Sequence, residues 1–118
     1  MPRKGVTGAP QISEADFQAL IIDYAELRGW LVYHVPDSRK VQRTGKGFPD
    51  LVLARRGEVI IAELKTDKGE LSKEQKEWFM LLKSAEIPEY SFEECLIRGM
   101  QVEIWRPKDW DMIEEMLR

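Results

Sequence analysis

Two carboxylates and a lysine stand at the ends of two neighbouring apolar runs. Asp50 opens the run at 51–54, and Glu63 and Lys65 follow the run at 59–62. Divalent cations such as Mg²⁺ take oxygen ligands, often one or two carboxylates together with water and phosphate. A lysine ammonium can orient a water molecule or offset charge that develops on a phosphate. These residue types therefore suggest metal-assisted hydrolysis of a phosphodiester.

The link between the two runs decides whether the three residues can meet. Residues 55–58 are short, polar and include a glycine, which predicts a β-hairpin with a loop of three to four residues. In a hairpin the start of one strand lies beside the end of the next, so Asp50 and Glu63 become neighbours. Strand alternation then puts Glu63 and Lys65 on one face and Leu64 on the other. The alternative is that Glu63 and Lys65 are simply polar positions of a half-exposed strand; the Pro49-Asp50 pair favours the metal site.

The rest of the chain predicts helices and strands around this hairpin. Ser13 is a good N-cap with Asp16 completing a capping box, and Gly29 ends that helix. Ser72 caps a second helix, and Pro107 opens a last short one. Further predicted segments are a strand at 30–35, a polar loop at 36–47, a turn at 66–70 and a strand at 100–105. Residues 87–99 look like an insertion, either a short helix or partly extended.

This element order predicts an α/β protein with a mixed central sheet flanked by helices. A chain of 118 residues has the usual size of one domain. We expect a flexible N-terminal segment at 1–12 and a single domain at 13–118.

Three strings in the chain resemble the VRR-NUC branch of the PD-(D/E)XK nuclease superfamily. They are GFPDL at 47–51, AELK at 62–65 and LSKEQKEW at 71–78. The resemblance covers residues 13–117. It implies a restriction-endonuclease-like core and cleavage of DNA that depends on Mg²⁺ or Mn²⁺. Stand-alone members of viral type are similar to Holliday-junction resolvases and act as homodimers, whereas members fused to larger repair proteins cut flaps and related branched DNA.

The resemblance also implies roles for individual residues. Asp50, Glu63 and the backbone carbonyl of Leu64 would bind metal, and Lys65 would be catalytic. Gln75 would reach the site from the second helix, and Glu14 would be an acid contributed by the first. Both of these last two have a second explanation that stays open. Gln75 completes a capping box with Ser72, and a carboxylate such as Glu14 is favoured in the first turn of any helix.

Charge is distributed unevenly along the chain. The net charge of −3 argues mildly against DNA binding, but residues 28–56 hold seven basic side chains against two acidic ones. This basic part surrounds the candidate metal site, where phosphate contacts are needed. The candidate DNA contacts are Arg39, Lys40, Arg43 and Lys46.

Cysteine, histidine and hydropathy exclude several classes of protein. Cys95 is the one cysteine and His34 the one histidine, so neither a disulfide framework nor a structural zinc site fits. His34 is interpreted as an ordinary sheet residue. No apolar run has the length of a membrane span and no secretory signal is recognisable. We therefore expect an intracellular protein without membrane attachment or organic cofactor.

Two alternatives to a junction resolvase remain at this stage. One is a nuclease directed at flaps or nicks, because loop shape and dimer geometry decide substrate preference. The other is a non-catalytic DNA-binding module in which the acidic residues are vestigial.

Overall fold

A computed structural model describes residues 11–36, 44–87, 90–92, 95–97 and 99–118 of the chain. The helices and strands follow one another as α1 (Glu14–Leu27), β1 (Leu31–His34), β2 (Leu51–Arg55), β3 (Glu58–Leu64), α2 (Lys73–Ser84), β4 (Tyr90–Phe92), β5 (Cys95–Ile97), β6 (Gly99–Trp105), the 3₁₀ turn η1 (Pro107–Asp109) and α3 (Trp110–Leu117). This order confirms the predicted α/β class with a mixed sheet, as in a restriction-endonuclease-like core.

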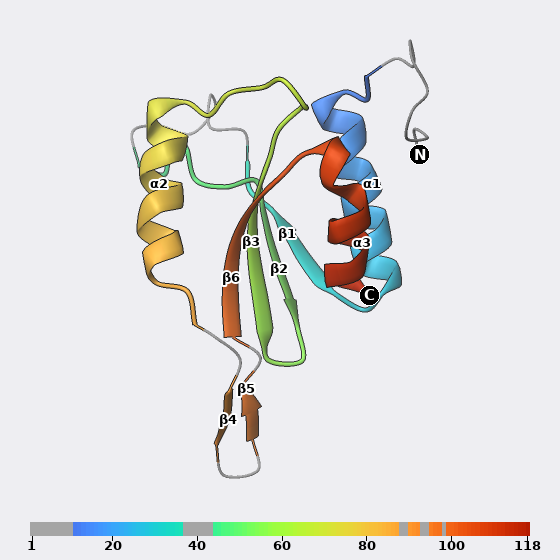
Figure 1. Ribbon diagram of the computed structural model, residues 1–118, viewed down its shortest axis with the longest axis vertical. Coiled ribbons are helices and arrows are strands. Elements are labelled where there is room, and N and C mark those ends of the chain that lie inside the picture. The colour runs from blue at the N-terminus through green and yellow to red at the C-terminus, as the bar shows by residue number, and fades with distance from the viewer. Residues whose placement is uncertain (1–10, 37–43, 88–89, 93–94, 98) are drawn as a thin grey trace.

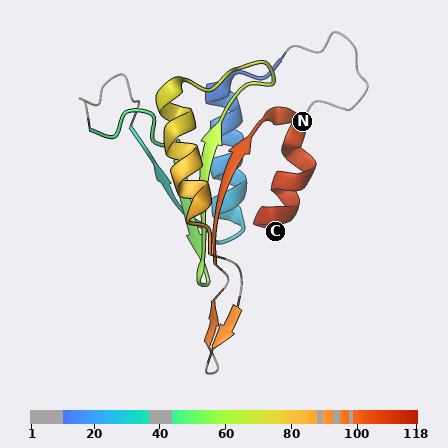
Figure 2. The same cartoon turned by 60° about the vertical axis from the view of Figure 1, so that its left-hand side comes forward.

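The central sheet has four strands in the order β1-β2-β3-β6. Strands β1, β2 and β3 pair antiparallel, whereas β3 and β6 run parallel. A parallel pair needs a long crossover connection, and here α2 is part of that connection. Helices α1 and α3 lie against one face of the sheet, and α2 lies on the other (Figures 1 and 2).

The hydrophobic core lies between the sheet and the pair α1–α3. Leu51 and Leu53 of β2 face it together with Ile60, Ala62 and Leu64 of β3, all with no exposed surface. The same cluster contains Phe17, Ile21, Ala25, Trp30, Trp105, Trp110, Ile113 and Leu117. Trp105 and Trp110 are therefore core residues. Helix α2 has no buried residue, so its position depends on a few specific contacts.

Helix α1 begins and ends where the sequence predicted. The Ser13 hydroxyl accepts a hydrogen bond from the Asp16 amide at 3.1 Å, which satisfies one free donor of the first turn. Gly29 follows the C-cap with φ of 88°, a left-handed conformation that glycine adopts at little cost. Among the described helices, none has the length and apolar character that a membrane crossing requires.

The β2–β3 turn is shorter than predicted. Arg55 and Glu58 form a pair within the ladder, so only Arg56 and Gly57 make the turn. Both have positive φ, 48° and 80°, as in the primed two-residue turns whose twist matches that of the flanking strands. The polar character of Arg55 and Glu58 suggested a loop, but strand ends tolerate charged side chains.

The structure decides between the two alternatives for residues 87–99 in favour of the extended one, and it moves the start of the last helix. The segment at 87–99 contains no helix among its described residues; β4 and β5 form a separate two-stranded antiparallel hairpin that projects from the body (Figure 1). Pro107 opens a 3₁₀ turn and α3 begins at Trp110. The N-terminus of α2 lies at one end of the sheet, and the hairpin projects from the other end (Figure 1).

Candidate active site

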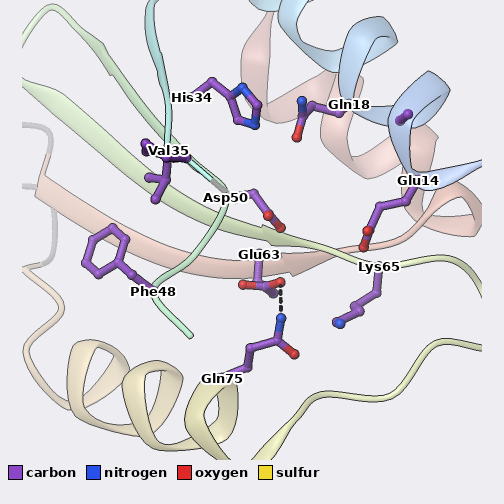
Figure 3. A pocket seen from close by; sticks show the side chains of 11 residues that line it. Glu14, Gln18, His34, Val35, Phe48, Asp50, Glu63, Lys65 and Gln75 are labelled. Atoms are coloured by element: carbon purple, nitrogen blue, oxygen red, sulfur yellow. Dashed lines mark hydrogen bonds between the residues drawn. The ribbon is translucent and has the colours of Figure 1, made fainter. Parts of the chain in front are cut away.

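A polar pocket of about 520 Å³ lies at the end of the sheet where β2 begins and β3 ends. It extends between the first turns of α1 and α2. All five side chains that the sequence singled out for catalysis line it, namely Glu14, Asp50, Glu63, Lys65 and Gln75 (Figure 3). They come from four different parts of the chain, so the fold alone brings them together.

Asp50 and Glu63 meet because of the β2–β3 register. Leu51 pairs with Ala62, which puts the preceding Asp50 beside the following Glu63. One Asp50 carboxylate oxygen accepts a hydrogen bond from the Leu64 amide at 2.7 Å. This short bond orients the Asp50 side chain across the end of β3, while the Leu64 side chain is buried in the core.

Glu63 is the one buried charged residue among those described, with 3% of its surface exposed. Burial, and after it the charge repulsion and hydrogen bond from the neighbouring Asp50, raise the pKa of its carboxyl to about 9. Glu14 adds to the pKa rise, whereas the Lys65 ammonium opposes it. Two adjacent carboxylates in a partly buried site make a strong demand for positive charge.

Gln75 has both of the roles that the sequence left open. Its side-chain oxygen accepts a hydrogen bond from the Ser72 amide at 2.8 Å, and the Ser72 hydroxyl accepts one from the Gln75 amide at 3.1 Å. This capping box begins α2. The Gln75 amide nitrogen donates to a Glu63 carboxylate oxygen at 3.1 Å (Figure 3). One side chain thus connects the start of α2 to the buried acid.

The two roles can be separated by a pair of substitutions. Gln75→Ala and Ser72→Ala each remove half of the capping box, so each should cost about 1 kcal/mol of stability. Only Gln75→Ala also releases the Glu63 carboxylate. We expect nuclease activity to fall in Gln75→Ala and to stay near wild type in Ser72→Ala, measured alongside thermal unfolding. Equal activities in the two variants would limit Gln75 to capping.

The backbone at Lys65 is held on both sides. The Lys65 amide donates to the Trp105 carbonyl at 3.0 Å, which ties it to the end of β6. The Arg106 guanidinium donates to the carbonyls of Thr66 at 2.6 Å and Gly69 at 2.7 Å, and so fixes the turn that follows. Lys65 therefore projects into the pocket from a rigid support.

The glycine of the GFPDL string has a steric cause. Gly47 has φ of 85°, and a Cβ at this position would lie 2.6 Å from backbone and side-chain atoms of Glu74. The loop before β2 therefore passes directly against the first turn of α2. Phe48 and Trp78 add an edge-to-face contact with ring centroids 5.0 Å apart, and the Trp78 indole donates to the Lys46 carbonyl at 3.0 Å. These contacts hold α2 close to Asp50.

The oxygen ligands of this pocket fit a divalent cation whose remaining ligands come from water and a phosphate of the substrate. Among the residues that the structure describes, no three His, Cys, Asp or Glu side chains form a cluster able to hold a metal ion. Mg²⁺, however, is commonly held by one or two carboxylates, with water and phosphate completing its shell. Asp50 and Glu63 provide two such carboxylates, and a cation between them would oppose the repulsion that raises the pKa of Glu63. The Leu64 carbonyl stays a predicted third ligand.

The predicted DNA contacts lie largely outside the described residues. This is the case for Arg39, Lys40 and Arg43. Lys46 is exposed, and its ammonium lies 3.7 Å from a carboxylate oxygen of Glu74. An exposed pair of this kind contributes little to stability, so Lys46 can exchange this partner for a phosphate at small cost.

His34 lies in strand β1, as the sequence predicted. Its side chain is exposed and lines the pocket together with Gln18 of α1. Position alone could not reveal this, because a histidine in a strand-like stretch faces the core, the solvent or a site equally well. One feature of the sequence could have indicated it. His34 ends the strand before the polar loop that leads to Asp50, and this strand pairs with β2.

Comparison with protein families finds a similarity that extends over most of the chain. Residues 13–99 match the family model of the VRR-NUC domain. All five predicted site residues fall within this matched range. Comparison with curated proteins and with solved structures gives no match.

Proposed function

The chain belongs to the VRR-NUC family, and from this premise we propose that it is a metal-dependent endonuclease that resolves four-way DNA junctions as a homodimer. The VRR-NUC domain gives it a nuclease-type function, with DNA as substrate. The proposal adds the dependence on Mg²⁺ or Mn²⁺, the branched substrate, the dimer and action inside a cell.

One observation carries the proposal of metal dependence. Asp50 and the buried Glu63 lie side by side, and each has one hydrogen bond that orients it: Asp50 from the Leu64 amide, Glu63 from Gln75. Two oriented carboxylates in contact are costly unless a cation joins them. A protein that only binds DNA has no need for carboxylates where phosphate must approach.

The residues divide the work of hydrolysis between them. Asp50 and Glu63, with the Leu64 carbonyl, would hold one or two Mg²⁺ or Mn²⁺ ions. A bound ion of this kind polarises the phosphodiester and lowers the pKa of water. Lys65 orients the attacking water and offsets negative charge on the phosphate. The P–O3′ bond breaks, and solvent protonates the departing 3′ oxygen. Gln75 keeps the Glu63 carboxylate in place. Glu14 adds a third carboxylate to the lining of the pocket.

Symmetry supports the homodimer. One active site cuts one strand, whereas paired cuts in a four-way junction require two sites related by a twofold axis. Leu31 and Tyr33 of β1 are 78% and 59% exposed on the sheet face opposite α1, and Leu81 of α2 is 64% exposed. Exposed apolar side chains of this kind are suited to a contact between copies. Light scattering after size exclusion should give twice the 13.8 kDa of one chain.

A cleavage assay tests the proposal directly. Labelled four-way junction, flap and linear duplex are incubated with Mg²⁺, Mn²⁺ or EDTA and the purified protein. Paired, symmetric nicks in the junction that disappear with EDTA are expected. Preferential flap cutting would keep the nuclease and replace its substrate. Absence of cleavage by folded protein with either metal would favour the non-catalytic binding module.

Metal binding can be measured without cleavage. Asp50→Asn removes one carboxylate charge and keeps a side chain of the same size. A ligand that binds only the folded state raises its apparent stability. We therefore expect Mg²⁺ to raise the melting temperature of the wild type and to do so much less in Asp50→Asn. An equal Mg²⁺ response in both proteins would remove Asp50 from the ligand set.

A further inference from the structure

The pocket has a second polar wall that the proposed mechanism does not use. His34 at the end of β1 and Gln18 in the second turn of α1 form it, and their side chains lie next to one another (Figure 3). In the same view Asp50 lies between this wall and Glu63, and Lys65 lies beside Glu63 (Figure 3). The His34–Gln18 wall is thus on the side of Asp50 that faces away from Glu63 and Lys65.

The fold aims both side chains at the pocket. His34 pairs with Leu51, and directly opposite residues of an antiparallel pair share a face. His34 therefore lies on the side of the sheet that α1 covers. Gln18 is one helical turn beyond Glu14, so the two share a helix face. The buried Phe17 and Ile21 anchor α1 in the core and fix the direction of that face.

The polar atoms of this wall are available to a ligand. Within the described part of the chain, neither the His34 side chain nor the Gln18 side chain has a hydrogen bond or ion pair. The imidazole N–H and the amide NH₂ are donors that suit a phosphate or sugar oxygen. His34 is exposed, so stability alone does not explain its position. Glu14 and Asp50 border the wall, and their carboxylates repel phosphate. On this side of the pocket, an anionic strand therefore finds its hydrogen-bond donors at His34 and Gln18.

We propose that His34 and Gln18 bind the DNA strand at the phosphate next to the scissile one, on the side of Asp50 and Glu63 away from Lys65. This inference rests on the proposed nuclease function. In an in-line displacement the attacking and leaving oxygens lie on opposite sides of phosphorus. Lys65 orients the attacking water, so the leaving 3′ oxygen lies on the side away from Lys65. The strand that carries this oxygen therefore continues past the carboxylates on that side. The wall meets the strand there and adds to the affinity for it.

Steady-state kinetics test the contact. We expect His34→Ala and Gln18→Ala each to raise KM about tenfold with kcat nearly unchanged, the pattern of a lost substrate hydrogen bond to a charged group. His34→Gln, which keeps an N–H donor, should recover part of the loss. Glu26→Gln, at the far end of α1, is the matched control and should leave both constants unchanged. A fall in kcat with unchanged KM would overturn the proposal.

Modified DNA identifies the phosphate that is contacted. A methylphosphonate removes the charged oxygen at one chosen position. At the contacted phosphate it should weaken binding by the wild type about tenfold, yet weaken His34→Ala little further, because the partner is already missing. Additive losses at every position would overturn the proposal. Cleavage of unmodified DNA by the wild type tests the nuclease itself, so the two failures are distinguishable.

A spectroscopic measurement gives a readout independent of turnover. His34 is the single histidine, so its imidazole signals in an NMR spectrum need no assignment. In the Lys65→Ala protein with Mg²⁺, titration with a short duplex should shift these signals in step with binding. Signals that stay in place while the DNA binds would exclude the contact.

Discussion

A Lys65→Ala protein is expected to bind Mg²⁺ and DNA but to show a kcat lowered by about 10²- to 10³-fold, the usual loss when one preorganised charge donor is removed. Lys65 lies in the pocket beside Glu63, close enough for its charge to lower the Glu63 pKa. The Lys65 amide is hydrogen-bonded to Trp105 at the end of β6, and the Arg106 guanidinium is hydrogen-bonded to the carbonyl of the next residue, Thr66. Removal of the Lys65 side chain therefore takes away positive charge without disturbing this support.

The control for this substitution is Lys68→Ala. Lys68 is exposed in the same turn and does not line the pocket. It carries the same charge, so a change that both variants share reflects general attraction of DNA. Single-turnover cleavage and fluorescence anisotropy, run on the three proteins, separate chemistry from binding. Full cleavage by Lys65→Ala would remove Lys65 from the mechanism.

Glu63→Gln should abolish metal-dependent cleavage and at the same time stabilise the protein in the absence of metal. The glutamine keeps the shape of Glu63 and can accept the hydrogen bond from Gln75 while removing the repulsion with Asp50. Relief of strain of this kind at a functional site commonly yields about 0.5–2 kcal/mol. Thermal unfolding in EDTA at neutral pH should show a melting temperature several degrees above wild type.

The pH dependence of this gain follows from the Glu63 pKa. The folded-state pKa of about 9 lies above the ordinary glutamate value of 4.5, so the folded protein binds the extra proton between these two pH values. Stability then falls as pH rises through that window, by up to about 1.4 kcal/mol for each pH unit. Below the window the wild type and Glu63→Gln should converge. Within it their melting temperatures in EDTA should separate as pH increases.

Addition of Mg²⁺ should reverse the order of the two proteins. A bound cation favours the ionised carboxylate, so it stabilises the wild type at neutral pH and has little effect on Glu63→Gln. A wild type that is more stable than Glu63→Gln in EDTA at every pH would contradict the assignment of an uncompensated buried acid. Matched melts with and without Mg²⁺ decide this.

Local sequence signals were enough for α1, α2 and the order along the chain of the strands in the central sheet. Ser13 and Gly29 bound α1, and Ser72 with Gln75 begins α2, because capping depends on residues close in the chain. The β2–β3 turn was predicted in the right place but too long. The difference arises because a two-residue turn depends on positive φ at Arg56, which few non-glycine residues adopt.

Residues 87–99 show where local signals fail. Short segments of mixed polarity fit a helix and a strand about equally well, and only pairing between partners decides. In the structure β4 pairs with β5, and neither joins the central sheet. The 3₁₀ turn at Pro107 is a smaller example, since the Asp109 side chain accepts a hydrogen bond from the Arg106 amide at 3.0 Å and reshapes the start of α3.

The sequence by itself determined the chemistry of the candidate site and the family, because residue types and short spacings carry that information. Asp50, Glu63 and Lys65 belong to two consecutive strands, whose register follows from alternation of apolar residues. Only the tertiary structure decided what surrounds them. Gln18 and His34 reach the same pocket because α1 begins and β1 ends at the same end of the sheet. Such contacts between distant segments depend on packing of the whole fold, which leaves no mark in local spacing.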